Sequence, residues 1–573
     1  MRIFAVARKD TLVRTQHHIT DIRPRVLAFS VLIGIVVVTG CAGGSQNSSS
    51  SAVIPVTPVT YTIGGTISGL SGTGLLLQDN GGNNLPVSGN GSFTLTAGIA
   101  SGGAFNITVL TQPSSPAQTC VVTNSGGTVT STNVTSVMIT CIASDSFALT
   151  GGMTTARQEQ IATLLNNGMV LVAGGFDFVS ASNVSSWASA ELYNHATGTF
   201  TPTGGMTTER VGQTATLLNN GQVLIAGGGH PSAELYNPAT GTFTSTGTMI
   251  TASAQQTSTL LNNGQVLIAG GFNGSASLAG AELYDPPTGT FTPTGNMTTE
   301  RASATATLLN NGDVLIAGGF NGSPALASAE LYDPERGTFT SAGNMTTERG
   351  LTTATLLNNG QVLIAGGENS NSGIVVASAE LYDPATGAFT ATGGMTSARE
   401  EHTATLLNNG QVLIAGGDNG IGFLSSAELY DPATGTFTAT PSMMTDSREQ
   451  QTATLLISGQ VLIAGGDHST SLASAELYLP ATLTPTGIVS ITVTPATPTL
   501  SVGSTQQFVA TGTFSNGSMQ NLQSVTWSSS NQAAGTITND ASDHGVALAL
   551  AAGKSTITAS AGSISGSIVL TVQ

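Results

Sequence analysis

The pattern of apolar and polar positions between residues 146 and 487 is a repeat of one short unit. The unit reads Thr-Ala-Thr-Leu-Leu, a turn Asn-Asn-Gly, and a second apolar run Gln-Val-Leu-Ile-Ala that ends in Gly-Gly, with small departures in single copies. A stretch of variable length follows, and then come Ala-Glu-Leu-Tyr-Asp-Pro and Gly-Thr-Phe-Thr. Short apolar runs bounded by Gly, Pro and Asn predict strands. The unit therefore predicts a four-stranded antiparallel meander, in which both Asn and Gly of the first turn accept positive φ and the paired glycines let backbones approach closely.

The tyrosine of the unit marks a period of 43 to 50 residues, at Tyr193, Tyr236, Tyr284, Tyr332, Tyr382, Tyr430 and Tyr478. A period near 50 with a double glycine resembles the kelch repeat of β-propellers. The resemblance implies a seven-bladed propeller over residues 146–487. The kelch tryptophan of the last strand is replaced here by Phe200, Phe243, Phe291, Phe339, Phe389 and Phe437. One such sheet cannot bury both of its faces, whereas sheets stacked around an axis can.

The seventh copy ends in Leu479–Gly487, which is shortened and has no Phe. The missing strand has a counterpart at the front of the repeats, where Ser146–Met153 matches Thr199–Met206. We therefore expect the N-terminal strand to complete the last blade and to leave no free sheet edge at the seam. In the alternative, Leu483–Thr486 forms the last strand and Phe147 packs elsewhere.

Two further β regions flank the repeats, so that the predicted fold is all-β. Residues 61–145 have short Val, Ile, Thr and Leu runs broken by Gly and Asn, which predicts a small β-sandwich. Residues 488–573, with the segments Ser490–Gly503 and Val525–Asn531, resemble the bacterial immunoglobulin-like group 2 module of intimins and invasins. Such modules act as rigid spacers or adhesive units, and we expect Trp527 to be the core aromatic residue of a second sandwich.

The N-terminus has the pattern of an export signal. Early cations precede Val26–Val38, a 13-residue stretch without charge, which is too short to span a bilayer but suits a secretory signal. The stretch ends in Val38-Thr39-Gly40-Cys41, which resembles the lipobox of bacterial lipoproteins. The resemblance implies a signal peptide over residues 1–40, a lipid on Cys41, and a flexible linker over residues 41–60. Ala42 is not the Asp that retains some lipoproteins at the inner membrane, so the outer membrane is expected; in the alternative, the signal peptide is an ordinary one and Cys41 is incidental.

Composition and cysteine content agree with export. Only 8% of the residues are charged and the formal net charge is −17, which excludes a basic nucleic-acid binder and a coiled coil. Cys120 and Cys141 are the cysteines that remain beyond Cys41. In an exported chain we expect them to form a disulfide, and two free thiols are the alternative.

The meander topology places candidate binding residues at one end of the propeller. The second connection of each unit and the links between units lie at the same end and vary among copies, and sites usually reside on such loops. The links carry Arg157, Arg210, Arg301, Arg349, Arg399 and Arg448, with Ser253 in the third link, and the third strands open with Glu191, Glu234, Glu282, Glu330, Glu380, Glu428 and Glu476. In one interpretation the arginines form a ring that binds an anionic or sugar ligand. In the other, each Arg–Glu pair is architectural and holds a link to its blade.

Enzyme chemistry has little support in the sequence. Kelch-type propellers include copper radical oxidases resembling galactose oxidase, which need a Cys–Tyr crosslink, but residues 146–487 contain no cysteine. Glu368, Asp418 and Asp467-His468 follow Gly-Gly in consecutive units, and their oxygens would suit Ca²⁺ if they converged; solvated loop carboxylates are the alternative. We identify no catalytic residue, metal site or cofactor.

These observations favour a non-enzymatic envelope lipoprotein whose propeller binds a protein or glycan, with a membrane anchor and no nucleic-acid partner. The alternative function is a polysaccharide hydrolase or lyase that uses acidic residues in the variable loops. A purely structural envelope role is the third interpretation.

Overall fold

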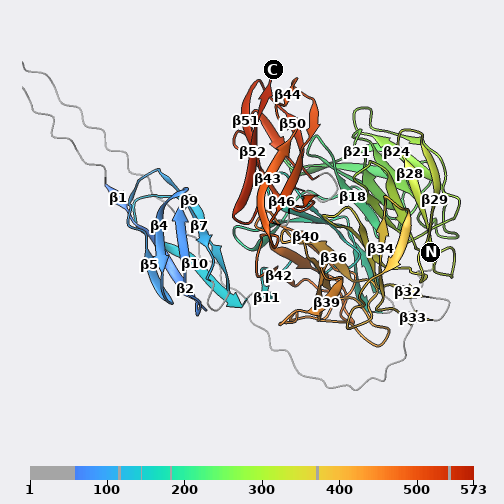
Figure 1. The fold of residues 1–573 in the computed structure, drawn as a ribbon, viewed down its shortest axis with the longest axis horizontal. Helices are drawn as coiled ribbons and strands as arrows, with labels where there is room; N and C mark the ends of the chain where they lie inside the picture. The colour runs from blue at the N-terminus through green and yellow to red at the C-terminus, as the bar shows by residue number, and fades with distance from the viewer. Residues whose placement is uncertain are drawn as a thin grey trace, which may run out of the picture. The chain divides into compact units, whose positions relative to one another are not determined.

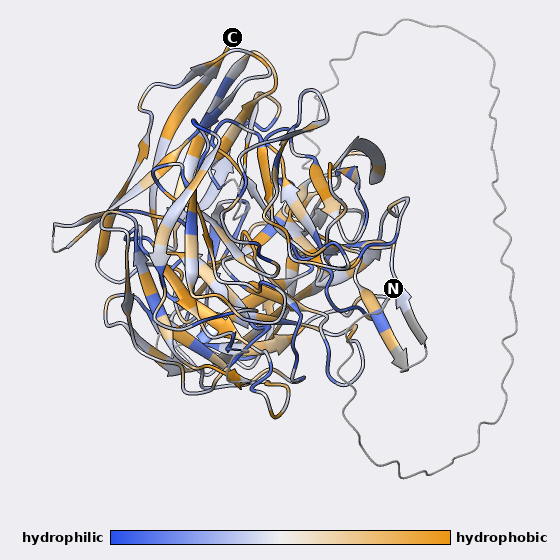
Figure 2. Ribbon diagram, turned by 90° about the vertical axis from the view of Figure 1, so that its right-hand side faces the viewer, coloured by the Kyte–Doolittle hydropathy of each residue, from blue (hydrophilic) through white to orange (hydrophobic). Residues whose placement is uncertain are grey.

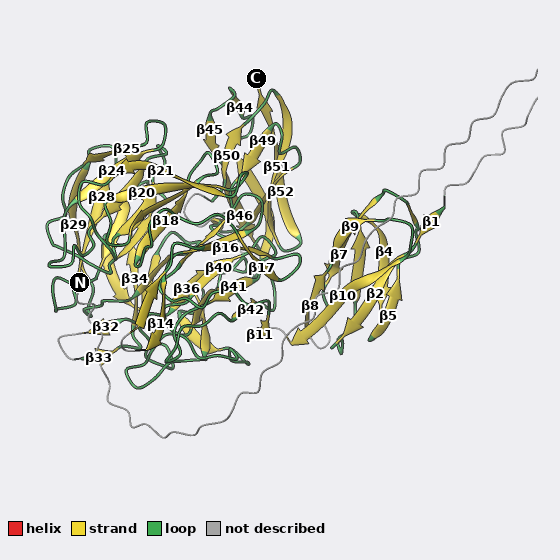
Figure 3. Ribbon diagram, turned by 180° about the vertical axis from the view of Figure 1, so that it is seen from behind, coloured by secondary structure: helices red, strands yellow, loops and turns green. Residues whose placement is uncertain are grey.

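The computed structural model describes residues 59–113, 118–143, 145–180, 183–369, 373–515, 517–539 and 544–573. Throughout these ranges the regular structure is β-strand, and no helix is present in them (Figure 1 and Figure 3). The predicted signal peptide, the lipid-attachment residue Cys41 and nearly all of the linker 41–60 lie outside the described residues. In the described ranges, no helix with the length and apolarity needed to span a bilayer was found.

The region after the linker is a β-sandwich of two four-stranded sheets. One sheet has the order β5-β2-β10-β8 and the other β4-β3-β7-β9, and β1 pairs with β6. The strands are β1 (Thr60–Tyr61), β2 (Ile63–Ser68), β3 (Leu75–Asp79), β4 (Gly82–Val87), β5 (Gly91–Thr94), β6 (Ile99–Ala100), β7 (Ala104–Thr111), β8 (Gln118–Thr123), β9 (Gly126–Thr128) and β10 (Val134–Ala143). Inward side chains such as Ile63, Leu77 and Ile139 form its core. Cys120 of β8 lies opposite Cys141 of β10, and the two are joined by a disulfide.

The repeats form seven four-stranded antiparallel sheets, which we number as blades 1 to 7. Blade 1 consists of β12 (Ile161–Leu164), β13 (Val170–Ala173), β16 (Ala190–Asn194) and β17 (Thr199–Pro202), and blade 2 of β18 (Gln213–Leu217), β19 (Val223–Gly227), β20 (Ser232–Asn237) and β21 (Thr242–Thr248). Blade 3 consists of β22 (Thr257–Leu260), β23 (Val266–Ala269), β24 (Ala281–Asp285) and β25 (Thr290–Pro293), blade 4 of β26 (Thr305–Leu308), β27 (Val314–Ala317), β28 (Ser328–Asp333) and β29 (Thr338–Asn344), and blade 5 of β30 (Thr353–Leu356), β31 (Val362–Ala365), β34 (Ala379–Asp383) and β35 (Ala388–Ala391). Blade 6 consists of β36 (Thr403–Leu406), β37 (Val412–Ala415), β38 (Ala427–Asp431) and β39 (Thr436–Ala439), and blade 7 of β40 (Thr452–Leu455), β41 (Val461–Ala464), β42 (Ala475–Leu479) and β11 (Ser146–Leu149). Short hairpins β14 (Phe176–Ser180) with β15 (Asn183–Ser186), and β32 (Glu368–Asn369) with β33 (Ile374–Val375), extend two of the variable connections.

The core of the propeller lies between the blades. The second strand of each blade is buried along its whole length and packs on both neighbouring sheets. In β13, Val170 and Val172 face blade 7, while Leu171 and Ala173 face blade 2. This explains why the strand is a continuous apolar run rather than an alternating one. Hydrophobic residues accordingly lie mostly on strands, and hydrophilic residues lie mostly on the connecting loops (Figure 2).

The Phe of the fourth strand packs on the Tyr of the third strand. Tyr332 and Phe339 lie opposite each other in register, and their ring centroids are 4.8 Å apart. The Tyr332 hydroxyl lies 2.8 Å from the Thr294 hydroxyl of the preceding blade. In blade 4 the phenylalanine thus stands in place of the tryptophan of the kelch repeat, and Tyr332 joins this blade to the preceding one.

The predicted ring closure is confirmed. β11 pairs antiparallel with β42 in blade 7, with Phe147 opposite Tyr478. Asp145, just before β11, accepts hydrogen bonds from the Tyr478 hydroxyl and the Ala481 amide, each at 2.9 Å. The alternative, with the last strand at Leu483–Thr486, is wrong because β11 already occupies that edge of the sheet.

The first turn of the unit differs from the prediction. Its glycine has positive φ, for example 93° at Gly312, but the two preceding asparagines do not. Leu309 accepts a hydrogen bond from the Gly312 amide and donates its own amide to Asp313. One left-handed residue closes this turn, because residues 309–313 separate the two strands and a loop of this length does not need the two left-handed residues of a two-residue hairpin.

The Gly-Gly prediction is confirmed at the end of the second strand. A Cβ atom at Gly175 would lie 2.4 Å from the carbonyl oxygen of Gln158, and φ at Gly175 is 80°. The chain therefore needs glycine at this position for two independent reasons.

The C-terminal region is an immunoglobulin-like sandwich. Its sheets have the orders β43-β46-β47, β44-β52-β51-β48 and β45-β50-β49. The strands are β43 (Ile488–Thr494), β44 (Thr499–Leu500), β45 (Thr505–Gln507), β46 (Val509–Phe514), β47 (Met519–Asn521), β48 (Thr526–Ser529), β49 (Gly535–Ile537), β50 (Val546–Ala549), β51 (Gly553–Ala561) and β52 (Ile564–Val572). Trp527 is 4% exposed and belongs to the core, as predicted.

Candidate functional site

The six link arginines are buried inside their blades. Their exposed fractions are 0 to 1%, at Arg157, Arg210, Arg301, Arg349, Arg399 and Arg448. Each forms an ion pair with the glutamate that opens the third strand of the same blade, at N–O distances of 3.0 to 3.4 Å. Burial lowers the pKa of these arginines, and the paired glutamate opposes that shift. A ligand at this end of the propeller therefore cannot contact these six guanidinium groups.

Blade 4 shows the geometry of this buried unit, which we call the clamp. Arg301 Nη1 donates to the carbonyl oxygens of Gly318 and Ser328 at 3.0 and 2.8 Å. Its Nη2 donates to Ser328 Oγ at 2.8 Å and to Glu330 Oε1 at 3.0 Å. Glu330 also accepts the backbone amide of Thr298 in the link at 2.7 Å. The clamp thus ties the link, the end of the second strand and the start of the third strand into one unit.

The residue after Gly-Gly varies among the blades at the same end of the propeller. These seven residues, the rim ring, are Phe176, Gly229, Phe272, Phe320, Glu368, Asp418 and Asp467 in blades 1 to 7. Six of them form a bridge with the residue that follows the link arginine or its Ser253 counterpart. The rim ring is therefore aromatic over blades 1, 3 and 4 and acidic over blades 5, 6 and 7. The acidic residues Glu368, Asp418 and Asp467 are identified from the sequence, but the aromatic residues Phe176, Phe272 and Phe320 are not.

A second ring lies where the links enter the innermost strands. Its members have positive φ in every blade, and this axial ring consists of Glu159, Gly212, Gln255, Ser303, Leu351, Glu401 and Gln450. Backbone amides join neighbouring blades here: Gln255 donates to Gly212, and Ser303 donates to Gln255. The Gln450 side chain donates to Glu401 Oε2 at 2.8 Å. These bonds place the ring around the propeller axis.

Carboxylates from both rings and from the link residues interact on blades 6, 7 and 1. Burial raises the pKa of Glu401 well above its ordinary value, and the charges of Glu449 and Glu159 raise it further. Burial, followed by the charges of Asp418 and Asp467, raises the pKa of Glu449 to about 7. We call Glu159, Glu401, Glu449, Asp418 and Asp467 the acidic arc. Groups of this kind accept hydrogen bonds when ionised and donate them when protonated.

The metal hypothesis finds no support in the geometry. Within the described ranges, no group of three or more His, Cys, Asp or Glu side chains is placed to hold a metal ion. His468 next to Asp467 instead lies by Ser447 and the Phe423 ring, with the two ring centroids 6.0 Å apart. Glu368, Asp418 and Asp467 share a face of the propeller without converging on one point.

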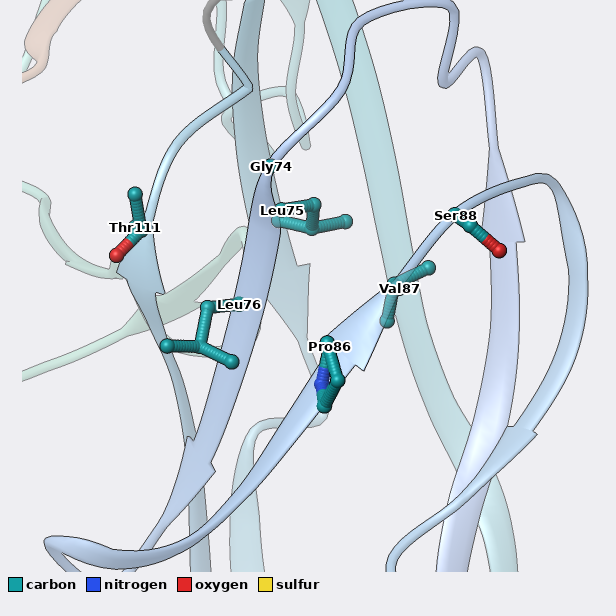
Figure 4. A pocket seen from close by; sticks show the side chains of 7 residues that line it. All are labelled: Gly74, Leu75, Leu76, Pro86, Val87, Ser88 and Thr111. Atoms are coloured by element: carbon teal, nitrogen blue, oxygen red, sulfur yellow. The ribbon is translucent and has the colours of Figure 1, made fainter.

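A hollow of about 430 Å³ lies in the N-terminal sandwich (Figure 4). It is lined by Leu75, Leu76, Pro86 and Val87, and its polar side chains are Ser88 and Thr111. Its lining has no titratable group, so it offers apolar contact and no chemistry.

Sequence comparisons identify two modules in the chain. The Kelch motif matches residues 256–298, 301–346 and 402–444. The bacterial Ig-like domain (group 2) matches residues 488–572. A curated relative, Ice-binding protein 1 of Shewanella frigidimarina (strain NCIMB 400), is 44% identical over 86 residues. That match covers 15% of this chain and only 9% of the relative.

A solved structure described as a novel fungal alcohol oxidase with catalytic diversity among the AA5 family, in complex with copper, is similar in fold. The TM-score is 0.51 at 17% identity, and the match covers 74% of this chain and 98% of the other. At this identity the likeness concerns the fold alone. The described chain is thus an all-β protein that has kelch repeats and an Ig-like group 2 domain, and the kelch repeats indicate a β-propeller binding scaffold.

Proposed function

We propose that this chain is a non-enzymatic cell-envelope protein whose propeller binds a glycan across the rim ring. The observation that carries the proposal is the division of the rim ring, which is aromatic over blades 1, 3 and 4 and acidic over blades 5, 6 and 7 on a rigid scaffold. Aromatic rings offer apolar faces for packing, and carboxylates accept hydrogen bonds from hydroxyl groups. Binding sites combine apolar lining with a few polar groups in this way. A protein ligand that presents the same groups is the other outcome of the test.

A glycan array probed with the full chain, followed by calorimetry on the hits, tests the proposal. Phe272→Ser and Asp418→Asn should each weaken binding at least about tenfold, because each removes one kind of contact. Thr201→Ala on the exposed outer strand β17 is the matched control and should bind normally. No glycan hit, or wild-type affinity in both rim variants, would contradict glycan recognition at the rim.

A polysaccharide hydrolase or lyase is the second candidate function. The pKa of about 7 at Glu449, beside Asp467 and Asp418, is the observation that favours it, because a general acid works best with a pKa near the operating pH. Incubation with the bound glycan and analysis of its chain length separates the two functions. Depolymerised product that is lost in Glu449→Gln would establish the enzyme and overturn the binding-only proposal.

We further propose that Cys41 carries a lipid that anchors the protein to the outer membrane. Several acyl chains at about 0.8 kcal/mol per buried CH₂ would hold it firmly. Metabolic labelling with a fatty-acid analogue should mark the wild-type chain and fail to mark Cys41→Ala. Labelling of both chains, or of neither, would contradict the anchor.

A further inference from the structure

Blade 3 differs from the six other blades at two positions of the clamp. Ser253 stands where the others have the link arginine, and Gly280 stands where the others have a serine. The remaining acceptors are retained, since Gly270 follows position 253 by the same 17 residues and Glu282 opens the third strand. Blade 3 thus has the carboxylate and both carbonyls of a clamp but supplies no guanidinium.

The backbone around this position keeps the form that it has in the neighbouring blade. The Ala254 amide donates to the Phe272 carbonyl at 3.0 Å, and the equivalent bond in blade 4 also measures 3.0 Å. The Gly270 amide donates to the Gly280 carbonyl at 3.0 Å, against 3.2 Å for the corresponding pair in blade 4. Glu282 and the carbonyl oxygens of Gly270 and Gly280 are what we call the acceptor frame. The backbone that carries this frame keeps its hydrogen bonds although blade 3 lacks the Arg and the Ser.

No side chain takes up the room beside Gly280. A Cβ atom built at Gly280 meets no heavy atom within 4 Å, and the residue itself is exposed. Ser253 is short, and its hydroxyl turns to Gln256 Oε1 at 3.4 Å. The frame is open to solvent on the side where the sister blades carry the serine.

Glu282 is 7% exposed, and among the described residues it has no ion pair like those of its counterparts, for example Glu330 with Arg301. Its Oε2 accepts the Ile250 amide at 2.9 Å, so that the backbone of the link is still held. Burial raises the pKa of Glu282, and the amides of Ile250 and Thr251 oppose that shift. A buried carboxylate gains most from a partner that brings both positive charge and hydrogen-bond donors.

We propose that Glu282 and the carbonyl oxygens of Gly270 and Gly280 form a binding site for the guanidinium group of an external ligand. Six copies of the same frame in this chain hold a guanidinium with these groups, at distances such as 3.0 Å from Arg301 to Glu330 and 2.8 Å to the Ser328 carbonyl. A planar cation with donors on two edges fits acceptors that point from two directions, whereas an ammonium acts as a point charge. The guanidinium belongs either to a small free compound or to an arginine side chain of a peptide.

Calorimetry on the full chain with methylguanidinium tests the site, at or below about 20 mM, which is far under the concentrations at which guanidinium denatures proteins. We expect saturable binding to one site, and methylammonium at equal ionic strength should bind at least about tenfold more weakly. Glu282→Gln should lose binding by a similar factor, because it removes the charged acceptor. Absent saturation, equal binding of the two cations, or unchanged binding in Glu282→Gln would each overturn the proposal.

A reconstructed clamp is the matched control. Ser253→Arg with Gly280→Ser restores the residues of the sister blades, and its own guanidinium should abolish methylguanidinium binding and raise the melting temperature. Gly280→Met is a second control in case the double variant does not fold, since it fills the open side from an exposed position and should also block binding. Retained binding in a folded form of either variant would place the ligand elsewhere.

Two probes distinguish the sources of the guanidinium. Agmatine represents small free compounds, and N-acetyl-arginine-amide represents an arginine in a peptide. Binding of the arginine amide within a few-fold of agmatine would assign the site to a peptide or protein partner. Binding of agmatine alone would assign it to a free compound, and binding of neither would overturn the proposal.

Discussion

The clamp and the rim ring lie at the same end of the propeller, but they differ in how they vary among the blades. The clamp keeps Arg, Ser and Glu in six blades and is buried. The rim ring, which lies two residues beyond the glycine whose carbonyl oxygen the clamp uses, changes from Phe to Gly to Asp or Glu. The Arg and Glu of the clamp are buried and held by their partners, whereas most rim positions are partly exposed and can vary to acquire a binding role.

The largest expected effect comes from breaking one clamp. Arg301→Ala should lower the free energy of unfolding of the propeller by about 3–5 kcal/mol, because it leaves Glu330 charged, buried and unpaired. Urea or thermal unfolding of the full chain measures this. Arg336→Ala is the control, since Arg336 pairs with Asp333 at an exposed turn and should change nothing measurable. If Arg301→Ala instead abolished binding of a ligand and left the free energy of unfolding unchanged, the result would favour the interpretation of the arginines as a ligand-binding ring.

The acidic arc should make stability depend on pH. Folded Glu449 keeps its proton up to about pH 7, whereas the unfolded chain releases it near 4.5. The folded state therefore binds more protons between these values, and stability falls as the pH rises from 4.5 to 7. The pKa of Glu449 is raised further by the charges of Asp418, Asp467 and Glu400. A hydrogen bond with Glu401 lowers it.

Glu449→Gln should remove much of this decline, on the order of 1–2 kcal/mol, because a neutral amide has no proton to lose. Melting temperatures at a series of pH values between 4 and 8 would measure it. The exposed Glu209→Gln serves as the control and should leave the profile intact. A wild-type profile that is flat, or that rises with pH, would contradict the raised pKa.

Two tyrosines in equivalent positions should respond differently to loss of the hydroxyl. Tyr332 contacts the Thr294 hydroxyl, but Tyr382 has Ala342 at the corresponding position, and among the described residues its hydroxyl has no hydrogen-bond partner. Tyr332→Phe should cost about 1 kcal/mol, while Tyr382→Phe should cost nothing or stabilise the chain slightly.

Ala342→Thr should then stabilise wild-type blade 5 and have no such effect on Tyr382→Phe. A double-mutant cycle by chemical denaturation gives the coupling between the two positions. Equal costs for the two Tyr→Phe changes would show that the inter-blade hydroxyl contact is not what holds these tyrosines.

The smallest expected effect on stability comes from the rim ring. Glu368→Gln should change the free energy of unfolding by less than about 0.5 kcal/mol, since the partly exposed side chain is not part of a clamp. Parallel measurement of glycan binding would show whether the same change matters for recognition. A loss of stability like that of Arg301→Ala would mean that the rim is also architectural.

Much of the fold could be predicted from residues that repeat. The period of Tyr193 and its counterparts indicates the sheets, and the unmatched strand around Phe147 indicates the closure. The turn glycines were predicted correctly but the asparagines beside them were not, because backbone angles in a turn depend on loop length as well as residue type. The arginines were found as a set, and the choice between a ligand ring and an architectural pair stayed open.

The residue pattern alone predicts the all-β class, the repeated sheets and the closing strand, and the Ig-like module follows from a family resemblance. The first three depend on local propensity and on apolar patterns that recur along the chain. Only the tertiary structure decided that Arg301 points into its blade, that Phe272 and Asp418 lie on opposite arcs of one ring, and that the space beside Gly280 is open. These features depend on which groups meet around an axis and on what volume they leave unfilled, and neither can be read from positions along a single strand.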